Sequence, residues 1–403
     1  MTTRCTPTRN RKQTEKSTSK DVKQGVQKYT IQNAILPVRQ LCSISYTIRQ
    51  GPKLLAEATK ADQRRFLSDC KVTLDLSRKV DSWLRGWRLA SVVPIVNSMS
   101  INLEMPPGTQ KLNSCLVVAP RGAGKSEFLE RILAISNPEY FVVLPPKIFE
   151  SELVQKPREF FHNKIMVLDD LIVSFDGMST KQRQQLENFW TKLLEGGYGR
   201  DAHSVINVST LVLFGLASEQ LDRFRQELMS ATFLDRVPPF KHNVTRQMKR
   251  RILQLRSQRS TKSSTRRPII KLPLPEKIED DKKVGIAFPR SKEIEAKIIE
   301  YAMELDNYGV QSSVRAQDYV KTFMRANALL NHRTAVTKSD LYLYDLVHPI
   351  FLNSMGELGT ENRVLGLIKN NPNLSDNERI KKSGLSRGTY YKYKEILRTK
   401  GAI

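Results

Sequence analysis

Short apolar runs alternate with segments of helical spacing in the middle of the chain. The runs have the length and composition of buried strands, and they lie at 114–118, 140–145, 164–169 and 209–216. Between them, apolar residues recur at intervals of three and four, which predicts helices at 125–135, 147–160 and 180–195. Residues 198–208 could form a hairpin. This alternation predicts an α/β fold over 108–240, with helices covering a parallel sheet.

The segments on either side of this core are predicted to be helical or unstructured. Residues 28–107 carry an apolar stripe at helical spacing, and residues 291–352, which we expect to form a helical lid, return to that periodicity. Between core and lid, residues 241–290 are basic and partly of low complexity, which indicates a linker or exposed arm. Residues 1–27 form a polar, basic tail that we expect to be disordered. A last domain, 353–403, ends in three predicted short helices.

Positive charge is concentrated outside the core. The formal net charge is +25. Residues 1–28 hold eight Lys/Arg and two acids, residues 241–271 hold eleven and none, and residues 379–403 hold eight and one. These three stretches account for nearly the whole excess, so the rest of the chain is close to neutral. Such a distribution favours a polyanionic partner, DNA first, over the alternative of linkers that only aid solubility.

Cysteine usage and hydropathy indicate the compartment. The four cysteines show no paired spacing and no Cys/His cluster, so structural zinc is not expected; they are Cys5, Cys42, Cys70 and Cys115. No apolar run approaches 18 residues, and no secretory signal is visible, so we expect no membrane partner. The expected location is the cytoplasm or the nucleoid.

The run APRGAGKS at 119–126 nearly matches the phosphate-binding pattern G-x-x-x-x-G-K-[ST]. Ala119 replaces the first glycine of the pattern, and alanine is the smallest substitute for it. Such a loop, between a strand and a helix, wraps backbone N–H groups around phosphate oxygens. The residues expected to bind nucleotide here are Gly122, Ala123, Gly124, Lys125 and Ser126. The alternative is an ordinary turn between strand and helix.

A second motif supplies acids. The predicted strand at 164–169 ends in Asp169 and Asp170, and in P-loop ATPases such a strand is expected beside the loop strand. Lys125 would then contact the β- and γ-phosphates, and Ser126 and Asp169 would hold Mg²⁺. Asp170 would polarise the attacking water, and its side chain is one methylene shorter than the usual glutamate. Solvated acids at a strand end are the alternative.

The order of motifs resembles that of the AAA+ ATPases. It runs APRGAGKS, IMVLDD, LLEGGYGRD, TLVLFGLAS and FLDRV. Further on, SSVRA, RANALLNHR and AVTKSDL look like a AAA+ helical lid, most similar to those of minichromosome-maintenance helicases and MoxR-type ATPases. The stretch from Ser126 to Asp169 leaves no obvious room for the insertion that these two families share. The resemblance, over about 108–352, implies ATP and Mg²⁺ as cofactors and a homo-oligomeric ring or filament.

The resemblance also implies roles for three further residues. Ser218 is the nearest candidate for the polar sensor 1 residue, where the family more often has asparagine. Arg236 in FLDRV is the candidate arginine finger, which would reach the γ-phosphate of a neighbouring subunit's nucleotide. Arg223 in LDRF competes with it. Arg315 matches the sensor 2 arginine, which touches the γ-phosphate; ordinary surface arginines are the alternative for both roles.

The C-terminal residues are predicted to form a helix-turn-helix domain. Ser375 and Glu378 have the spacing of a capping box, Gly384 ends that helix, and Ser386 caps the next. The pattern resembles winged-helix domains, whose third helix enters the major groove of DNA. Residues expected toward bases are Ser386, Arg387, Thr389 and Tyr390, and residues expected near phosphates are Lys392, Lys394 and Arg398. A three-helix module that docks a protein is the alternative.

Three functions therefore remain open. The first is a DNA-binding AAA+ ATPase, an ATP hydrolase acting as replication initiator, helicase or loader. The second is a MoxR-like chaperone that remodels proteins, for which DNA would not affect ATP turnover. The third is a nucleotide-switched DNA-binding regulator with weak turnover. The basic stretches and the predicted helix-turn-helix favour the first and third.

Overall fold

The computed structural model describes most of the chain from residue 53 onward. The described residues are 53–106, 112–199, 205–221, 231–245, 248–250, 252–254, 257, 267–306, 312–358, 364–365, 367–368, 371–383, 387–399, 401 and 403. The predicted basic tail at 1–27 lies outside them.

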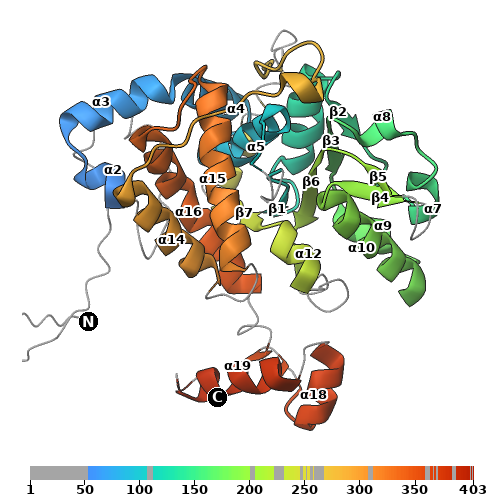
Figure 1. Ribbon diagram of the computed structural model, residues 1–403. Coiled ribbons are helices and arrows are strands. Elements are labelled where there is room, and N and C mark those ends of the chain that lie inside the picture. Colours follow the sequence, from blue (N-terminus) through green and yellow to red (C-terminus); the bar gives the residue numbers. More distant parts are fainter. Residues whose placement is uncertain are drawn as a thin grey trace, which may run out of the picture.

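A five-stranded parallel sheet forms the centre of the α/β part, in the order β2-β3-β6-β1-β7 (Figure 1). The strands are β1 (Cys115–Ala119), β2 (Phe141–Val143), β3 (Lys164–Leu168), β6 (Thr210–Ala217) and β7 (Pro239–Lys241). β1 and β6 are buried along their whole length, as expected of strands covered on both faces. The predicted α/β class with a parallel sheet is confirmed.

Two features of the sheet differ from the prediction. β6 pairs with both β1 and β3, so the acid-bearing strand β3 is not directly beside the loop strand β1. β7 was not predicted, because it is three residues long and begins with Pro239. Proline is tolerated there because β7 is an edge strand. Since β6 is parallel to both neighbours, the carboxyl ends of β1, β3 and β6 still meet at one edge of the sheet.

The helices of the α/β part largely follow the predicted periodicity. The helix after β1 is α6 (Lys125–Phe128), continued by the π-helical η2 (Leu129–Ala134). The single helix expected at 147–160 is wrong: α7 (Glu150–Leu153) and α8 (Arg158–Phe161) are separate, because Pro157 directly precedes α8 and disfavours continuation. The remaining elements are α9 (Leu171–Phe175), α10 (Thr180–Leu194), the antiparallel pair β4 (Gly197–Gly199) and β5 (Val205–Asn207), η3 (Ser218–Gln220) and α12 (Ala231–Arg236).

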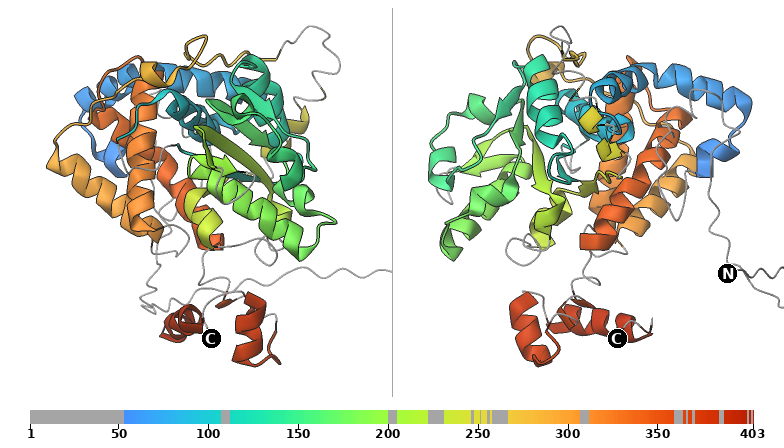
Figure 2. Two further views of the ribbon diagram at one scale, coloured as in Figure 1. Left: turned by 45° about the vertical axis from the view of Figure 1, so that its right-hand side comes forward. Right: turned by 180° about the vertical axis from the view of Figure 1, so that it is seen from behind.

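Helices from the two flanking segments pack together beside the sheet (Figures 1 and 2). They are α2 (Lys53–Glu57), α3 (Lys60–Asp69), α4 (Lys71–Trp83), α5 (Arg88–Met99), η1 (Ser100–Asn102), α14 (Lys292–Asp306), α15 (Ser313–Leu330) and α16 (Lys338–Leu358). All residues of α5 are buried, and the Asn97 side chain donates to the Tyr319 hydroxyl of α15 at 2.7 Å. One hydrophobic cluster includes these helices and the sheet.

Residues 267–290, the second half of the predicted basic arm, lie against the α/β part as an extended segment. The Asn137 side chain donates to the carbonyl of Ile270 at 2.9 Å and accepts from the N–H of Leu272 at 2.8 Å. Ile270 is fully buried, and Ala287 forms a bridge with Ala335. This segment, with η4 (Asp280–Lys282), belongs to the folded core. Residues 258–266 lie outside the described residues.

The C-terminal helices have a small core of their own. They are α18 (Asp376–Ser383) and α19 (Arg387–Thr399). Tyr390 and Leu397 of α19 form a cluster with Val364 that is separate from the main one, and Ile380 of α18 packs against it. Ser375 and Glu378 make the predicted capping contacts: the Ser375 N–H donates to the Glu378 carboxylate at 2.8 Å. Among the described residues, every helix is too short or too polar to span a lipid bilayer.

Candidate functional site

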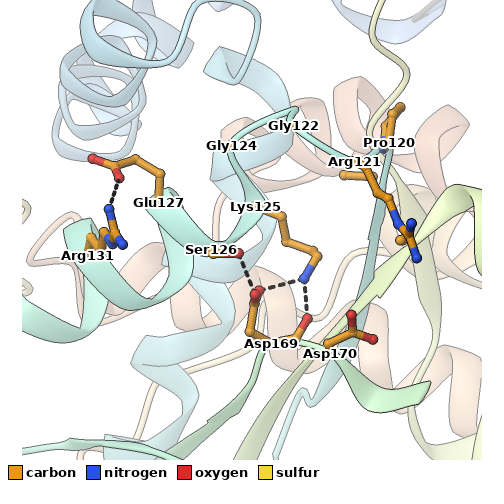
Figure 3. A pocket seen from close by; sticks show the side chains of 12 residues that line it. Pro120, Arg121, Gly122, Gly124, Lys125, Ser126, Glu127, Arg131, Asp169 and Asp170 are labelled. Atoms are coloured by element: carbon orange, nitrogen blue, oxygen red, sulfur yellow. Dashed lines mark hydrogen bonds and ion pairs between the residues drawn. The ribbon is translucent and has the colours of Figure 1, made fainter. Parts of the chain in front are cut away.

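The predicted phosphate-binding loop lines a cavity of about 320 Å³ at the carboxyl edge of the sheet. β1 contributes Ala119, β3 is followed by Asp169 and Asp170, and β6 ends in Ala217. The loop supplies most of the rest of the lining, as Figure 3 shows. The further lining residues are Pro120, Arg121, Gly122, Gly124, Lys125, Ser126, Glu127 and Arg131. Ala123 is almost completely buried and lies outside the lining.

Two glycines give the loop its backbone conformation. Gly122 has φ 75° and Gly124 has φ 96°, a region that residues with a Cβ rarely adopt. A Cβ on Gly124 would also lie 2.9 Å from Leu84 Cδ2, whereas one on Gly122 would meet nothing within 4 Å. The loop is therefore closely packed on its Gly124 side. The Gly124 carbonyl accepts the first helical hydrogen bond, from Phe128 N–H at 2.9 Å.

Lys125, Ser126 and Asp169 converge in the cavity (Figure 3). The Lys125 ammonium lies 2.5 Å from Asp169 Oδ1 and also donates to the Asp169 backbone carbonyl. The Ser126 hydroxyl donates to Asp169 Oδ2. Both side chains of the charged pair are largely buried, at 11% and 18% exposed. The structure thus brings together three of the side chains predicted to hold nucleotide and metal.

The oxygen atoms at this point are of the kind that Mg²⁺ takes. Ser126 Oγ and Asp169 Oδ2 are adjacent, and Mg²⁺ bound with a nucleotide takes one or two protein oxygens, the rest coming from phosphates and water. Asp170 Oδ1 is buried and has no hydrogen-bond partner in the part of the chain that the structure describes. This donor set fits a magnesium ion, which would neutralise phosphate charge. No group of three or more acidic, histidine or cysteine side chains suited to a metal occurs among the described residues.

Gly215 is a site residue that the sequence reading missed. It lies inside β6, opposite Val117 of β1. A Cβ there would be 2.1 Å from the Asp169 carbonyl oxygen and 2.7 Å from Lys125 Nζ. Only glycine leaves room for the Lys125–Asp169 contact. The signal in the sequence was a glycine within an otherwise apolar strand, TLVLFGLA.

Glu219 is a second missed residue and contacts the loop from η3. Its carboxylate accepts from the Arg121 backbone N–H at 3.1 Å. Partial burial raises the pKa of Glu219, but hydrogen bonds from its own backbone and that of Arg121 outweigh this and hold the pKa below its ordinary value. Ser218, the predicted sensor 1 residue, contacts Glu219 at 3.4 Å and is absent from the cavity lining. The structure therefore places Glu219 nearer to the loop backbone than Ser218.

The two predicted arginines do not line the cavity. Arg236 at the end of α12 is 7% exposed and forms an ion pair with Glu195. Arg315 in α15 lies 2.9 Å from Asp235 and 3.9 Å from Glu195. Both guanidinium groups thus form ion pairs with acids of the same chain, and their expected roles toward a γ-phosphate stay predictions. Arg223 lies outside the described residues.

The exposed face of α19 differs from the predicted DNA-contacting set. Tyr390 is fully buried and donates to Asp376 at 3.1 Å, so it packs in the core and does not face bases. Lys394 is 15% exposed and ion-paired with Asp376, so its ammonium group is not presented to a phosphate backbone. Hydrogen bonding from Lys394, with smaller help from Tyr390 and Arg379, holds the pKa of Asp376 below its ordinary value despite partial burial.

The remaining cations of α19 are accessible. Arg387, Lys392 and Arg398 are exposed, and the Arg387 guanidinium lies 6.0 Å from the Tyr391 ring centroid. Arg398 pairs with Glu395 at 3.5 Å on the surface. Ser386 and the Thr389 side chain lie outside the described residues.

No protein-family model matches the chain, and no curated protein matches it in a sequence comparison.

Proposed function

We propose that the chain binds MgATP at the phosphate loop and hydrolyses it. The single observation that carries this is the convergence of Lys125 and Ser126 on Asp169 beside a glycine loop. A cation for phosphate oxygens, two oxygen donors for Mg²⁺ and a second carboxylate, Asp170, are the groups that phosphoryl transfer requires. A AAA+ ATPase is the family that this arrangement, together with the order of the sequence motifs, favours.

We also propose that ATP use is coupled to DNA, in replication initiation, helicase action or loading. Three basic stretches carry nearly the whole charge excess, and Arg387, Lys392 and Arg398 are exposed on α19. Exposed Lys and Arg side chains suit contacts with a phosphate backbone. Homo-oligomerisation remains part of the proposal through the AAA+ resemblance.

A nucleotide-switched DNA-binding regulator with weak turnover is the second candidate. Arg236 and Arg315 are engaged by Glu195 and Asp235, so neither is available to stabilise charge on a transferred phosphoryl group in this conformation. Aspartate at position 170, in place of glutamate, also favours slow hydrolysis. Either form would bind nucleotide, and the two differ in turnover.

Steady-state ATP hydrolysis separates these candidates. We expect wild-type turnover to rise with double-stranded DNA and to vanish in Lys125→Ala. Turnover indifferent to DNA would contradict coupling and favour a protein-remodelling ATPase. Nucleotide binding without turnover, with or without DNA, would contradict the hydrolase and leave the regulator.

A further inference from the structure

We infer that the N-terminal helices hold the phosphate loop in its binding geometry, with Trp87 as the positioning residue. The inference rests on the proposed nucleotide site and adds a role for a segment, 53–106, whose function the sequence did not indicate. It concerns the connection between α4 and α5, which lies directly against the loop.

The Trp87 indole reaches the backbone of the loop. Its Nε1–H donates to the Ala123 carbonyl at 2.7 Å, and both residues are buried. Phe128 and His242 flank the ring, with centroids 5.1 Å and 4.4 Å away. The indole is therefore held from several sides, and its donor has a fixed direction.

This hydrogen bond acts on the peptide that joins Ala123 to Gly124. The C=O and N–H of a trans peptide point in opposite directions. A carbonyl fixed toward Trp87 therefore aims the Gly124 N–H away from the indole, and Gly124 lines the cavity. Backbone N–H groups are what such loops offer to phosphate. Leu84 closes the same side, 2.9 Å from where a Gly124 Cβ would lie.

A second tryptophan fixes the helix that follows the loop. Trp83 Nε1 lies 3.1 Å from Glu127 Oε1, and Arg267 Nε lies 2.8 Å from the same oxygen. Glu127 stands directly after Ser126 and lines the cavity. The helix that begins at Lys125 is thus anchored to α4 and to the extended segment 267–290.

The opposite end of α4 is attached to the lid. Asn331, just after α15, accepts from the Val72 N–H at 2.9 Å, and Thr73 Oγ1 donates to Asn327 Oδ1 at 2.6 Å. A rigid helix of thirteen residues, Lys71–Trp83, therefore joins the lid to the loop. Through this helix, a shift of the lid would move the loop backbone, and a shift of the loop would move the lid.

The test is equilibrium binding of MgATP to the full chain, measured by calorimetry for wild type, Trp87→Phe and Trp190→Phe. Trp87→Phe keeps a ring but removes the donor to Ala123; we expect about tenfold weaker binding, because a buried carbonyl loses its partner. Trp190 is the matched control. It is equally buried, and its Nε1 has no hydrogen-bond partner among the residues that the structure describes, so Trp190→Phe should bind as wild type does.

Equal affinity of wild type and Trp87→Phe would overturn the inference, as would an equal loss in both variants, which would indicate general destabilisation. Failure of wild type to bind MgATP would overturn the proposed function as well, so the two failures are distinguishable. If Trp87→Phe does not fold, a second measurement decides. The chain has three tryptophans, so Trp190→Phe leaves Trp83 and Trp87 as fluorophores. MgATP should change their emission, and adding Lys125→Ala should abolish the change; no change would contradict the inference.

Discussion

The Lys125–Asp169 contact depends on Gly215 having no side chain. Its Cβ position is occupied by the Asp169 carbonyl and the Lys125 ammonium. We predict that Gly215→Ala displaces both, lowers MgATP affinity at least tenfold and costs about 1–3 kcal/mol of stability, as overpacking usually does. Calorimetry and denaturant unfolding would measure the two effects.

Gly388→Ala is the matched control, because a Cβ at position 388 meets nothing within 4 Å. In α19 this change should leave MgATP affinity unaltered and add about 0.5–1 kcal/mol of helix stability. A Gly215→Ala variant that binds MgATP as tightly as Gly388→Ala would contradict the close packing described here.

His242 makes stability depend on pH. Burial lowers the pKa of His242 from 6.5 to about 3, so the folded protein keeps the imidazole neutral while the unfolded chain takes up a proton below 6.5. Stability should therefore fall as pH decreases from about 6.5 toward 3. The loss attributable to this residue at pH 5 is about 2 kcal/mol.

Denaturant unfolding between pH 5 and 7.5 tests this, with His242→Phe as comparison. Both ring nitrogens of His242 lack hydrogen-bond partners in the described part of the chain, so phenylalanine should be tolerated. We expect a flatter pH dependence in His242→Phe. The same slope in both proteins would show that His242 does not carry the effect.

At the scale of elements, α19 offers two neighbouring lysines with different surroundings. Lys392 is exposed, whereas Lys394 is ion-paired with Asp376. We predict that Lys392→Ala weakens DNA binding with little sequence dependence and reduces its salt slope by about one. Lys394→Ala should instead loosen the small C-terminal core, seen as faster hydrogen exchange in α18 and α19.

Binding titrations over a salt series distinguish the two variants. Salt-independent affinity of the wild type would contradict a phosphate-contacting surface. Equal effects of both variants on binding, with no change in hydrogen exchange, would contradict the separation of surface and core lysines.

Local signals in the sequence predicted elements better than contacts between them. The strands β1, β2, β3 and β6 follow from short apolar runs, and the hairpin was expected in the stretch between the third helix of the core and the next strand. β7 was not predicted, because three residues that start with Pro239 give no periodic signal. The position of β6 between β1 and β3 also could not be read, since apolar runs do not encode strand order.

The same distinction holds for the site. Lys125, Ser126 and Asp169 were found because loop and acid strand have recognisable spacing. Tyr390 was assigned to the wrong face because helix position alone does not say which side packs on Val364. The ion pairs of Arg236 with Glu195 and of Arg315 with Asp235 join residues far apart in the sequence, so the sequence alone could not show them. The role of Trp87 depends on the fold bringing residues 87 and 123 together.

At the scale of the whole molecule, one hydrophobic cluster joins the N-terminal helices, the sheet and the lid. The phosphate loop lies where these parts meet, with Trp87 on one side and the carboxyl edge of the sheet on the other. Nucleotide binding there would therefore affect the packing of both flanking helical segments. The small cluster around Tyr390 is separate, which leaves α19 free to present its own surface.

The central claim, that the loop at 119–126 binds MgATP, is tested most directly by calorimetric titration of three proteins: wild type, Lys125→Ala and Lys164→Ala. Lys164 begins β3 at the opposite edge of the sheet, so its replacement makes the same charge change far from the cavity. We predict binding by wild type and Lys164→Ala, and a loss of about 2–3 kcal/mol or more in Lys125→Ala, because a charge-assisted contact to phosphate is removed. Absence of binding in all three, or equal binding in all three, would contradict the nucleotide site.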